Sequence, residues 1–584
     1  MKKIYLSFSF LIISLFLNSY AAVHATAKGP IPFAVNQTED QRKTYEAFTD
    51  KMIIATQGTE STKAAIEIYA KGGNLIDAAI AASFVISVER PQSTGLGGGG
   101  FMLFHDAKSG KDYAIDFRER APLAATEKMF LDAKGEIIPD LSTEGILSAG
   151  TPGLVAGLWE IHQKFGKLPW ADLVRPAILL AEKGVVVYPH LATAMKTQKD
   201  VLSTYSSTKK IFLKENGDLY LEAESIVQKD LANTLRLIAK DGAKAFYQGP
   251  ISKQIVAEFK KHKGLVTAKD LADYKVHWRE PVRGTYKGYE VLSFPPPSSG
   301  GVHIIEILNI LENDNLKQMG PWSKDALHLT VGAMQLAFAD RAQYLGDPDF
   351  VKVPTKGLTS KSYAADQRKK IPADRALKAD EVAAANAPGY ESSETTNFSL
   401  MDADGNAIIS TQTLNGYMGS GVVVEGAGFL LNNEMDDFSA KPGSSNMYGA
   451  VGGTPNSIAP LKTPLSSMSP TIVLKNNKPV LGLGAPGGTK IITCVTQTIL
   501  NYLEYGLPLY DSVADLRFHH QWKPDELLLE TPGPSAEVVA QLTALGYTPK
   551  VGAISCKVNA VSRESDNKLH GVADPRDLGA ASGL

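Results

Sequence analysis

The sequence predicts a globular protein of the mixed α/β (α+β) class, and three observations support this class. Before residue 390, apolar and small residues recur at helical spacing over long stretches. After residue 394, alternating polar and apolar runs flank turn signals, which is typical of β-hairpins. The chain has 584 residues, 44% of them hydrophobic and 21% charged, so it can bury a large core.

The first 27 residues have the features of a secretory signal peptide. Lys2 and Lys3 precede an apolar stretch at residues 4–17, and alanines within residues 21–27 offer cleavage sites. A membrane anchor is the alternative, but these 14 apolar-rich residues include three serines and are too short to span a bilayer well. No later run reaches the length of a membrane-spanning helix. We therefore expect an exported protein without stable membrane association.

Charge and cysteine content narrow the possible partners. The net charge is −2 with the signs mixed along the chain, which argues against nucleic acid or an anionic membrane. The two cysteines, Cys494 and Cys556, are too few for a disulfide framework. Because Cys494 lies in an apolar helical run, we expect buried free thiols.

Helical segments dominate the chain before residue 390. Two packed helices are predicted within residues 61–88, around a Gly72-Gly73-Asn74 break. Residues 95–100 contain a G-x-G-x-x-G match, but a strand-like run follows it in place of a helix, so we reject dinucleotide binding and expect close backbone packing. Further helices are clearest at residues 154–165, 173–182, 251–259 and 302–311, and an exposed linker is predicted at residues 388–394.

A strand ending at Asp116 leads into a dense cluster of charged residues. Arg118 in this cluster could clamp a carboxylate with two parallel hydrogen bonds. A surface ion pair is the alternative, and this stretch alone favours it.

Two hairpins and a glycine pair follow residue 394. Strands are predicted at residues 395–401 and 407–414, and at 471–475 and 480–484. Gly487 and Gly488 then open a helical run over 489–505. Backbone N–H groups at such a start can hold an oxyanion, because the first-turn donors lack partners, although a tight turn explains the glycines equally well.

Carboxylates and hydroxyls are grouped in two loops of this region. Glu434, Asp436 and Asp437 directly follow an apolar strand and suit an ammonium group. A metal site is the competing interpretation, and it is disfavoured because no histidines cluster at ligand spacing. Ser466 and Ser467 could hold a carboxylate or cap a turn.

The bond between Glu394 and Thr395 joins a polar run to a strand-like run, and we interpret it as one that the protein cuts in itself. Cutting would give Thr395 a free α-amine, with an ordinary pKa of about 7.7–8.0, beside its own hydroxyl nucleophile. A Thr-Thr pair entering a strand is also ordinary β-propensity. Together with the predicted cation, acids and oxyanion donors, this residue indicates acyl transfer from a compound with a free amino-acid head. No G-x-S-x-G motif supports an α/β-hydrolase.

The sequence resembles the γ-glutamyltransferase (γ-glutamyltranspeptidase, glutathione hydrolase) family of N-terminal-nucleophile hydrolases over almost the whole mature chain. Seven motifs in the same order carry the resemblance: Asp116–Glu119, Pro295–Gly301, Thr395-Thr396, Thr413–Asn415, Asn432–Phe438, Pro464–Pro470 and Pro486–Gly488. The resemblance implies a four-layer αββα sandwich. It also implies autocleavage of one precursor before Thr395, which yields a large subunit, residues 28–394, and a small catalytic subunit, residues 395–584.

The resemblance also implies a role for each matching residue. Thr395 would be the nucleophile and Thr413 would position its hydroxyl. The α-carboxylate of the substrate would be held by Arg118, Ser466 and Ser467, the α-ammonium by Asn415, Glu434 and Asp437, and the oxyanion by the N–H groups of Gly487 and Gly488. Residues 442–460, which include Tyr448, correspond to a lid loop. Position 434 is Glu where some bacterial members carry Gln.

The implied substrates are glutathione and other γ-glutamyl compounds, with water, amino acids or dipeptides as acceptors and no cofactor or metal. The resemblance is closest to Gram-negative periplasmic members, so the periplasm is the expected location, with the medium as the alternative. Two other functions stay open: a cephalosporin-acylase-like amidase, and an uncut, non-catalytic secreted binding protein of the same fold. The lid and the complete set of residues for an amino-acid head argue against the first.

Overall fold

The computed structural model describes residues 38–382 and 395–584. The predicted signal peptide, the linker at residues 388–394 and Glu394 lie outside the described residues. Within the described part of the chain, no helix is both long and apolar enough to cross a membrane.

Two seven-stranded antiparallel sheets form the centre of the molecule. Sheet A runs in the order β1 (Glu46–Thr49), β18 (Leu569–Val572), β17 (Asn559–Arg563), β13 (Lys478–Gly484), β12 (Thr471–Lys475), β9 (Tyr289–Ser293), β8 (Val282–Tyr286). Sheet B runs in the order β19 (Ala580–Gly583), β2 (Met52–Thr56), β10 (Thr396–Asp402), β11 (Ala407–Thr413), β3 (Gly99–Asp106), β4 (Lys111–Asp116), β7 (His277–Arg279). Both predicted hairpins are confirmed, as β10–β11 and β12–β13.

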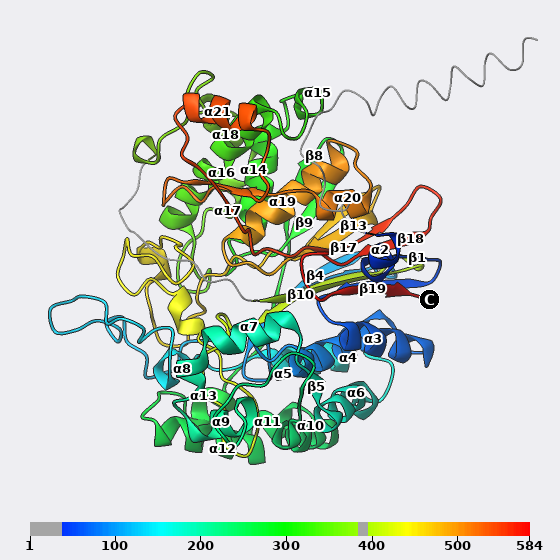
Figure 1. Ribbon diagram of the computed structural model, residues 1–584, viewed down its shortest axis with the longest axis vertical. Coiled ribbons are helices and arrows are strands. Elements are labelled where there is room, and N and C mark those ends of the chain that lie inside the picture. The colour runs from blue at the N-terminus through cyan, green and yellow to red at the C-terminus, as the bar shows by residue number, and fades with distance from the viewer. Residues whose placement is uncertain (1–37, 383–394) are drawn as a thin grey trace, which may run out of the picture.

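Helices cover the outer face of each sheet (Figure 1). The layer on sheet B includes α3 (Thr59–Ala70), α4 (Leu75–Glu89), α5 (Leu154–Phe165), α6 (Trp170–Lys183), α10 (Lys229–Asp241), α11 (Ala243–Tyr247), α12 (Pro250–Lys261) and α13 (Ala268–Ala272). The layer on sheet A includes α14 (Gly300–Leu311), α16 (Lys324–Tyr344), α18 (Lys361–Lys369), α19 (Lys490–Leu503), α20 (Leu509–Ala514) and α21 (Ala536–Ala544). The predicted four-layer αββα sandwich is confirmed.

Shorter helices and two smaller sheets lie outside the four layers. They are α2 (Glu39–Tyr45), α7 (Pro189–Thr197), α8 (Lys199–Leu202), α9 (Ser206–Phe212), α15 (Leu316–Met319), α17 (Thr355–Leu358), the pair β5 (Val185–Val186) and β6 (Ser225–Ile226), and the sheet of β14 (Phe518–His519), β15 (Leu527–Glu530) and β16 (Pro549–Gly552).

The two faces of β10 show how the layers pack. Phe398 and Leu400 point into the apolar core shared with the helices on sheet B. On the other face, Ser399 donates a hydrogen bond of 2.9 Å to the Asn559 carbonyl of β17, which links the two sheets. All seven residues of β10 are buried. The polar alternation that predicts this strand therefore separates two buried faces, not a buried face from a solvated one.

The glycine-rich stretch before β3 packs against the end of β11. A Cβ atom on Gly98 would lie 2.0 Å from the Thr413 carbonyl, and one on Gly97 would lie 2.1 Å from the Leu430 carbonyl. Neither position has room for a side chain, so the prediction of close backbone packing is confirmed. This contact fixes the end of β11, which carries a candidate site residue.

Candidate active site

Thr395 lies directly before β10, the strand between β2 and β11 in sheet B, and is 4% exposed. Its hydroxyl oxygen is 3.3 Å from that of Thr413, the last residue of β11. The Asn415 N–H donates to the Thr413 hydroxyl oxygen at 2.8 Å, which leaves the Thr413 hydrogen able to point toward Thr395. The β10–β11 hairpin thus holds the two hydroxyls side by side.

One cavity brings together ten of the eleven residues that the sequence assigns to catalysis or substrate binding. It is lined by Arg118, Thr395, Thr413, Asn415, Glu434, Asp437, Tyr448, Ser466, Ser467 and Gly488, together with Arg341, Asn446, Ala450, Met468, Thr489 and Ile491. The eleventh, Gly487, precedes Gly488 directly and is not part of the lining.

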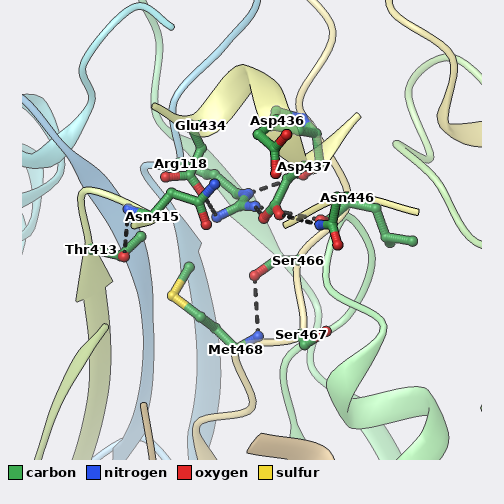
Figure 2. Close-up of polar contacts among 12 residues, drawn as sticks. Arg118, Thr413, Asn415, Glu434, Asp436, Asp437, Asn446, Ser466, Ser467 and Met468 are labelled. Atoms are coloured by element: carbon green, nitrogen blue, oxygen red, sulfur yellow. Dashed lines mark hydrogen bonds and ion pairs between the residues drawn. The ribbon is translucent and has the colours of Figure 1, made fainter. Parts of the chain in front are cut away.

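Arg118 lies at the centre of a buried charge cluster and is 1% exposed, so the surface ion-pair interpretation is wrong. Its guanidinium forms ion pairs with Glu434 and with Asp437, the latter at 2.5 Å (Figure 2). Its Nε donates to the Pro464 carbonyl at 2.9 Å. Burial alone would lower the pKa of Arg118, but the neighbouring carboxylates of Glu434 and Asp437 raise it above its ordinary value. The cation and the acids that the sequence separates are therefore in direct contact.

The carboxylates around Arg118 hold protons more tightly than exposed ones. Burial raises the pKa of Glu434 to about 7 and that of Asp436 to about 6, and it also raises the pKa of Asp437. Glu119, which the sequence does not single out, is fully buried, and its pKa is raised well above the ordinary value by burial and by the nearby Glu434 charge. Of these four acids, Glu434 and Asp437 line the cavity, where an ammonium group would stabilise their ionised forms, whereas Asp436 accepts hydrogen bonds from Ser142 and the Met447 N–H.

The hydroxyls of Ser466 and Ser467 each accept a hydrogen bond from the protein. The Met468 N–H donates to Ser466 Oγ at 3.1 Å (Figure 2), and Arg341 Nη2 donates to Ser467 Oγ at 3.3 Å. The contact with Met468 is the turn cap that the sequence allows. Because each oxygen has a donor bound to it, each hydroxyl hydrogen is available for an acceptor in the cavity. The pair is thus suited to an anion.

Gly487 and Gly488 both have positive φ, at +141° and +56°, immediately before α19. Among the described residues, neither N–H group donates to another residue. A Cβ atom on Gly488 would lie 2.5 Å from Cδ1 of Tyr448, and one on Gly487 would lie 3.1 Å from Cβ of Cys556. The glycines are therefore favoured by the turn and by close packing, and Gly488 lines the same cavity as Thr395.

The predicted lid segment is tied to the charge cluster. The Tyr448 hydroxyl lies 2.7 Å from the carbonyl oxygen and 2.6 Å from Oδ1 of Asn415. Asn446 Nδ2 donates to Asp437 Oδ1 at 2.8 Å, and the Met447 N–H donates to Asp436 Oδ2 at 2.9 Å. Three consecutive residues, Asn446, Met447 and Tyr448, thus hydrogen-bond the segment to residues in and beside the cavity wall.

Arg341 is the one charged residue of the cavity lining that sequence reasoning missed. It lies near the end of α16, whose residues 326–342 are all buried. A signal was present, because Asp340 and Arg341 form a charged pair in an otherwise apolar stretch, Leu336–Ala342. Charged side chains are rarely buried unless they have a polar or charged partner or a functional role.

Comparison with known proteins identifies the family. The family model described as gamma-glutamyltranspeptidase matches residues 61–584. The glutathione hydrolase proenzyme of Escherichia coli (strain K12) is 45% identical over 90% of each chain, and that of Pseudomonas aeruginosa is 42% identical over 92% of this chain and 95% of its own length. The acylase ACY 1 proenzyme of a Pseudomonas species is 34% identical over 93% of this chain and 95% of its own length.

Solved structures agree with this match. Cephalosporin acylase from Bacillus halodurans superposes with a TM-score of 0.83 at 28% identity over 92% of this chain and 97% of that chain. Helicobacter pylori gamma-glutamyltranspeptidase has a TM-score of 0.55 at 42% identity over 56% of this chain and 93% of that chain. The two stacked antiparallel sheets between helical layers, shared with these enzymes, define the class of N-terminal-nucleophile hydrolases. Within that class, the chain belongs to the γ-glutamyltranspeptidase family.

Proposed function

We propose that the protein is an exported, self-processing γ-glutamyltransferase and glutathione hydrolase, in which Thr395 is the nucleophile for both reactions. One observation carries this assignment: the Thr395 hydroxyl lies beside Thr413 in a cavity whose wall also holds a complete set of groups for an amino-acid head.

In processing, Thr395 Oγ attacks the Glu394 carbonyl carbon with backbone N–H groups stabilising the oxyanion. The peptide C–N bond breaks, the nitrogen of Thr395 takes the proton, and Glu394 is left as an ester on Oγ. Water opens this ester, which releases the Glu394 carboxylate and frees both the hydroxyl and the α-amine of Thr395.

In turnover, the freed α-amine accepts the Thr395 hydroxyl proton as Oγ attacks the γ-carbonyl of glutathione or a related amide. The N–H groups of Gly487 and Gly488 hold the oxyanion of the tetrahedral intermediate. The amide C–N bond breaks, and the leaving amine takes the proton from the α-amine. Water or the amine of an amino acid or dipeptide then attacks the γ-glutamyl ester and regenerates Thr395.

Recognition of the γ-glutamyl group uses the zwitterion of its amino-acid head. The α-carboxylate binds Arg118 and the hydroxyls of Ser466 and Ser467, and the α-ammonium binds Asn415, Glu434 and Asp437. Arg118 already pairs with both acids, so a bound zwitterion exchanges these two internal ion pairs for contacts of its carboxylate with Arg118 and of its ammonium with the acids.

The first test is intact mass and N-terminal sequencing of the purified protein beside a Thr395→Ala control. A fragment that begins Thr-Thr-Asn-Phe-Ser, absent from the control, is expected. A folded wild-type protein that stays whole would favour the uncut binding protein. The same sequencing, applied to protein from the periplasm and from the medium, tests removal of the predicted signal peptide and the site of export.

The acylase alternative is kept because acylases are among the similar proteins. A glutaryl group carries the carboxylate but lacks the α-ammonium, so its binding would separate Arg118 from Glu434 and Asp437 and leave the acids without a cation. An unpaired buried charge costs about 3–5 kcal/mol, so the γ-glutamyl anilide should react at least ~100 times faster than the glutaryl anilide. Equal rates would favour the acylase.

A further inference from the structure

Arg341 is a second buried cation in the cavity wall, contributed by α16, far along the chain from Arg118. Its side chain is held at two points: Nε donates to Ser299 Oγ at 3.0 Å, and Nη2 donates to Ser467 Oγ at 3.3 Å. It is 6% exposed. The guanidinium is therefore fixed in the wall and is not a mobile surface group.

The charges of the two arginines are balanced differently. Arg118 has two carboxylates in direct contact. Among the described residues, no carboxylate lies within ion-pair distance of Arg341. Burial lowers the pKa of Arg341 to about 10, against a smaller raising effect of Asp437, so the group stays charged at neutral pH. A buried charge without a direct counter-ion is stabilised when an anion enters beside it.

We propose that Arg341 is a positioning and specificity-determining residue for the α-carboxylate of the substrate, acting through Ser467. Its Nη2 donor occupies a lone pair of Ser467 Oγ, so that the hydroxyl hydrogen is presented to the carboxylate. Its charge attracts the substrate carboxylate directly. Arg118 is neutralised by Glu434 and Asp437, so it can attract that carboxylate only after those ion pairs rearrange. This role rests on the proposed γ-glutamyl transfer.

A purely structural role for Arg341 makes a different prediction. Ser299 Oγ, which accepts from Arg341 Nε, donates in turn to the Ser466 carbonyl at 2.8 Å, and the Ser299 N–H donates to the same oxygen at 2.8 Å. Arg341 thus also braces the turn that carries both serines. Ser299→Ala cuts this brace and keeps the charge, which makes it the matched control.

The test compares three variants, Arg341→Gln, Arg341→Lys and Ser299→Ala, on two 4-nitroanilides. One carries the γ-glutamyl group, and the other carries 4-aminobutanoyl, which is the same group without the α-carboxylate. We expect Arg341→Gln to lose about 10- to 100-fold in kcat/KM on the γ-glutamyl substrate, mainly through KM, and less than about threefold on the 4-aminobutanoyl substrate. Arg341→Lys should lie between wild type and Arg341→Gln, and Ser299→Ala should stay within about threefold of wild type on both.

Thermal shift with free L-glutamate and with 4-aminobutanoate gives a second readout that does not require turnover. Wild type should be stabilised by L-glutamate, and Arg341→Lys and Arg341→Gln progressively less, with little response of any variant to 4-aminobutanoate. Equal losses on both anilides, or a Ser299→Ala variant that behaves as Arg341→Gln does, would overturn the role of Arg341. A wild type that is inactive on the γ-glutamyl anilide would instead overturn the proposed function, and the role of Arg341 with it.

Discussion

Gly488 offers a sharp test of the proposed oxyanion hole, through the substitution Gly488→Ala. Its φ of +56° lies in the left-handed region, where a residue with a Cβ atom costs about 1–2 kcal/mol. The new Cβ would also lie 2.5 Å from Cδ1 and 2.9 Å from Cγ of Tyr448, so the ring or the turn must move. Overpacking of this kind costs about 1–3 kcal/mol more.

The matched control is Gly506→Ala, since Gly506 has a φ of +70° and no atom lies within 4 Å of the place that its new Cβ would take. The Gly506→Ala variant therefore has the backbone strain of a positive φ without the steric overlap. We expect chemical denaturation to show a loss of about 1–2 kcal/mol for Gly506→Ala and about 2–5 kcal/mol for Gly488→Ala. A double-mutant cycle of Gly488→Ala with Tyr448→Ala should give a coupling energy of at least about 1 kcal/mol, because removal of the ring removes the overlap.

The kinetic effect is expected to separate the two variants more clearly than their stabilities do. Displacement of one oxyanion donor costs about 2.7–4 kcal/mol in the transition state, or 10²–10³-fold in kcat. We therefore expect Gly488→Ala to lose at least ~100-fold in kcat on the γ-glutamyl anilide and Gly506→Ala to stay near wild type. If Gly488→Ala stays within about threefold of Gly506→Ala, Gly488 does not hold the oxyanion.

Four further outcomes are expected. Thr413→Val should lower kcat on the γ-glutamyl anilide by about 10- to 100-fold while Thr413→Ser stays near wild type, because only serine keeps the hydroxyl 3.3 Å from the nucleophile; equal rates would contradict this positioning role. Tyr448→Phe should raise KM several-fold with little change in kcat, since the hydroxyl holds Asn415, and an unchanged KM would count against it. Burial raises the pKa values of Glu306 and Asp340 to about 7, so between pH ~4 and ~7 the folded protein keeps protons that the unfolded chain releases. The stability that these two protonated groups contribute is therefore complete below pH ~4 and is lost as the pH rises to ~7. Asp340→Asn should reduce that loss by up to about 1.4 kcal/mol per pH unit, as read from urea denaturation at pH 4.5 to 7.5, and parallel curves for the two proteins would refute it. Finally, the two fragments produced by cleavage should co-elute in native size-exclusion chromatography and separate only under denaturing conditions.

The sequence predicts the elements around the site well but not their packing. The β10–β11 hairpin is found because its alternation and turn are local signals. The sequence does not predict that both faces of β10 are buried, because polar residues such as Asn397 and Ser399 suggest a solvated face. In the structure that face packs on sheet A, where Ser399 donates to the Asn559 carbonyl of β17, and Asn397 Nδ2 donates to the Ser410 carbonyl of the neighbouring strand β11 in sheet B. Strand order across two sheets is set by contacts that no local pattern encodes.

The same limit applies to the charges of the candidate site. Motifs single out Arg118, Glu434 and Asp437 individually, but their mutual ion pairs follow from the way the end of β4 meets the loop after residue 431. Arg341 carries no motif at all. It reaches the cavity only because α16 packs on sheet A with its end beside the turn that contains Ser467.

The arrangement of strands explains how a chain could be cut before Thr395 and remain one folded unit. Sheet B takes β2, β3, β4 and β7 from residues before the cut and β10, β11 and β19 from residues after it. Sheet A is mixed in the same way, with β1, β8 and β9 from the first part and β12, β13, β17 and β18 from the second. Separation of the parts would break backbone ladders in both sheets and expose the apolar core between them. β10 also pairs on both sides, with β2 from Phe398 and with β11 from Thr396, so the residue after Thr395 is already anchored. A new N-terminus at Thr395 would therefore stay beside Thr413 without the covalent link, so the α-amine that the proposed mechanism uses would be released without a change in the position of Thr395.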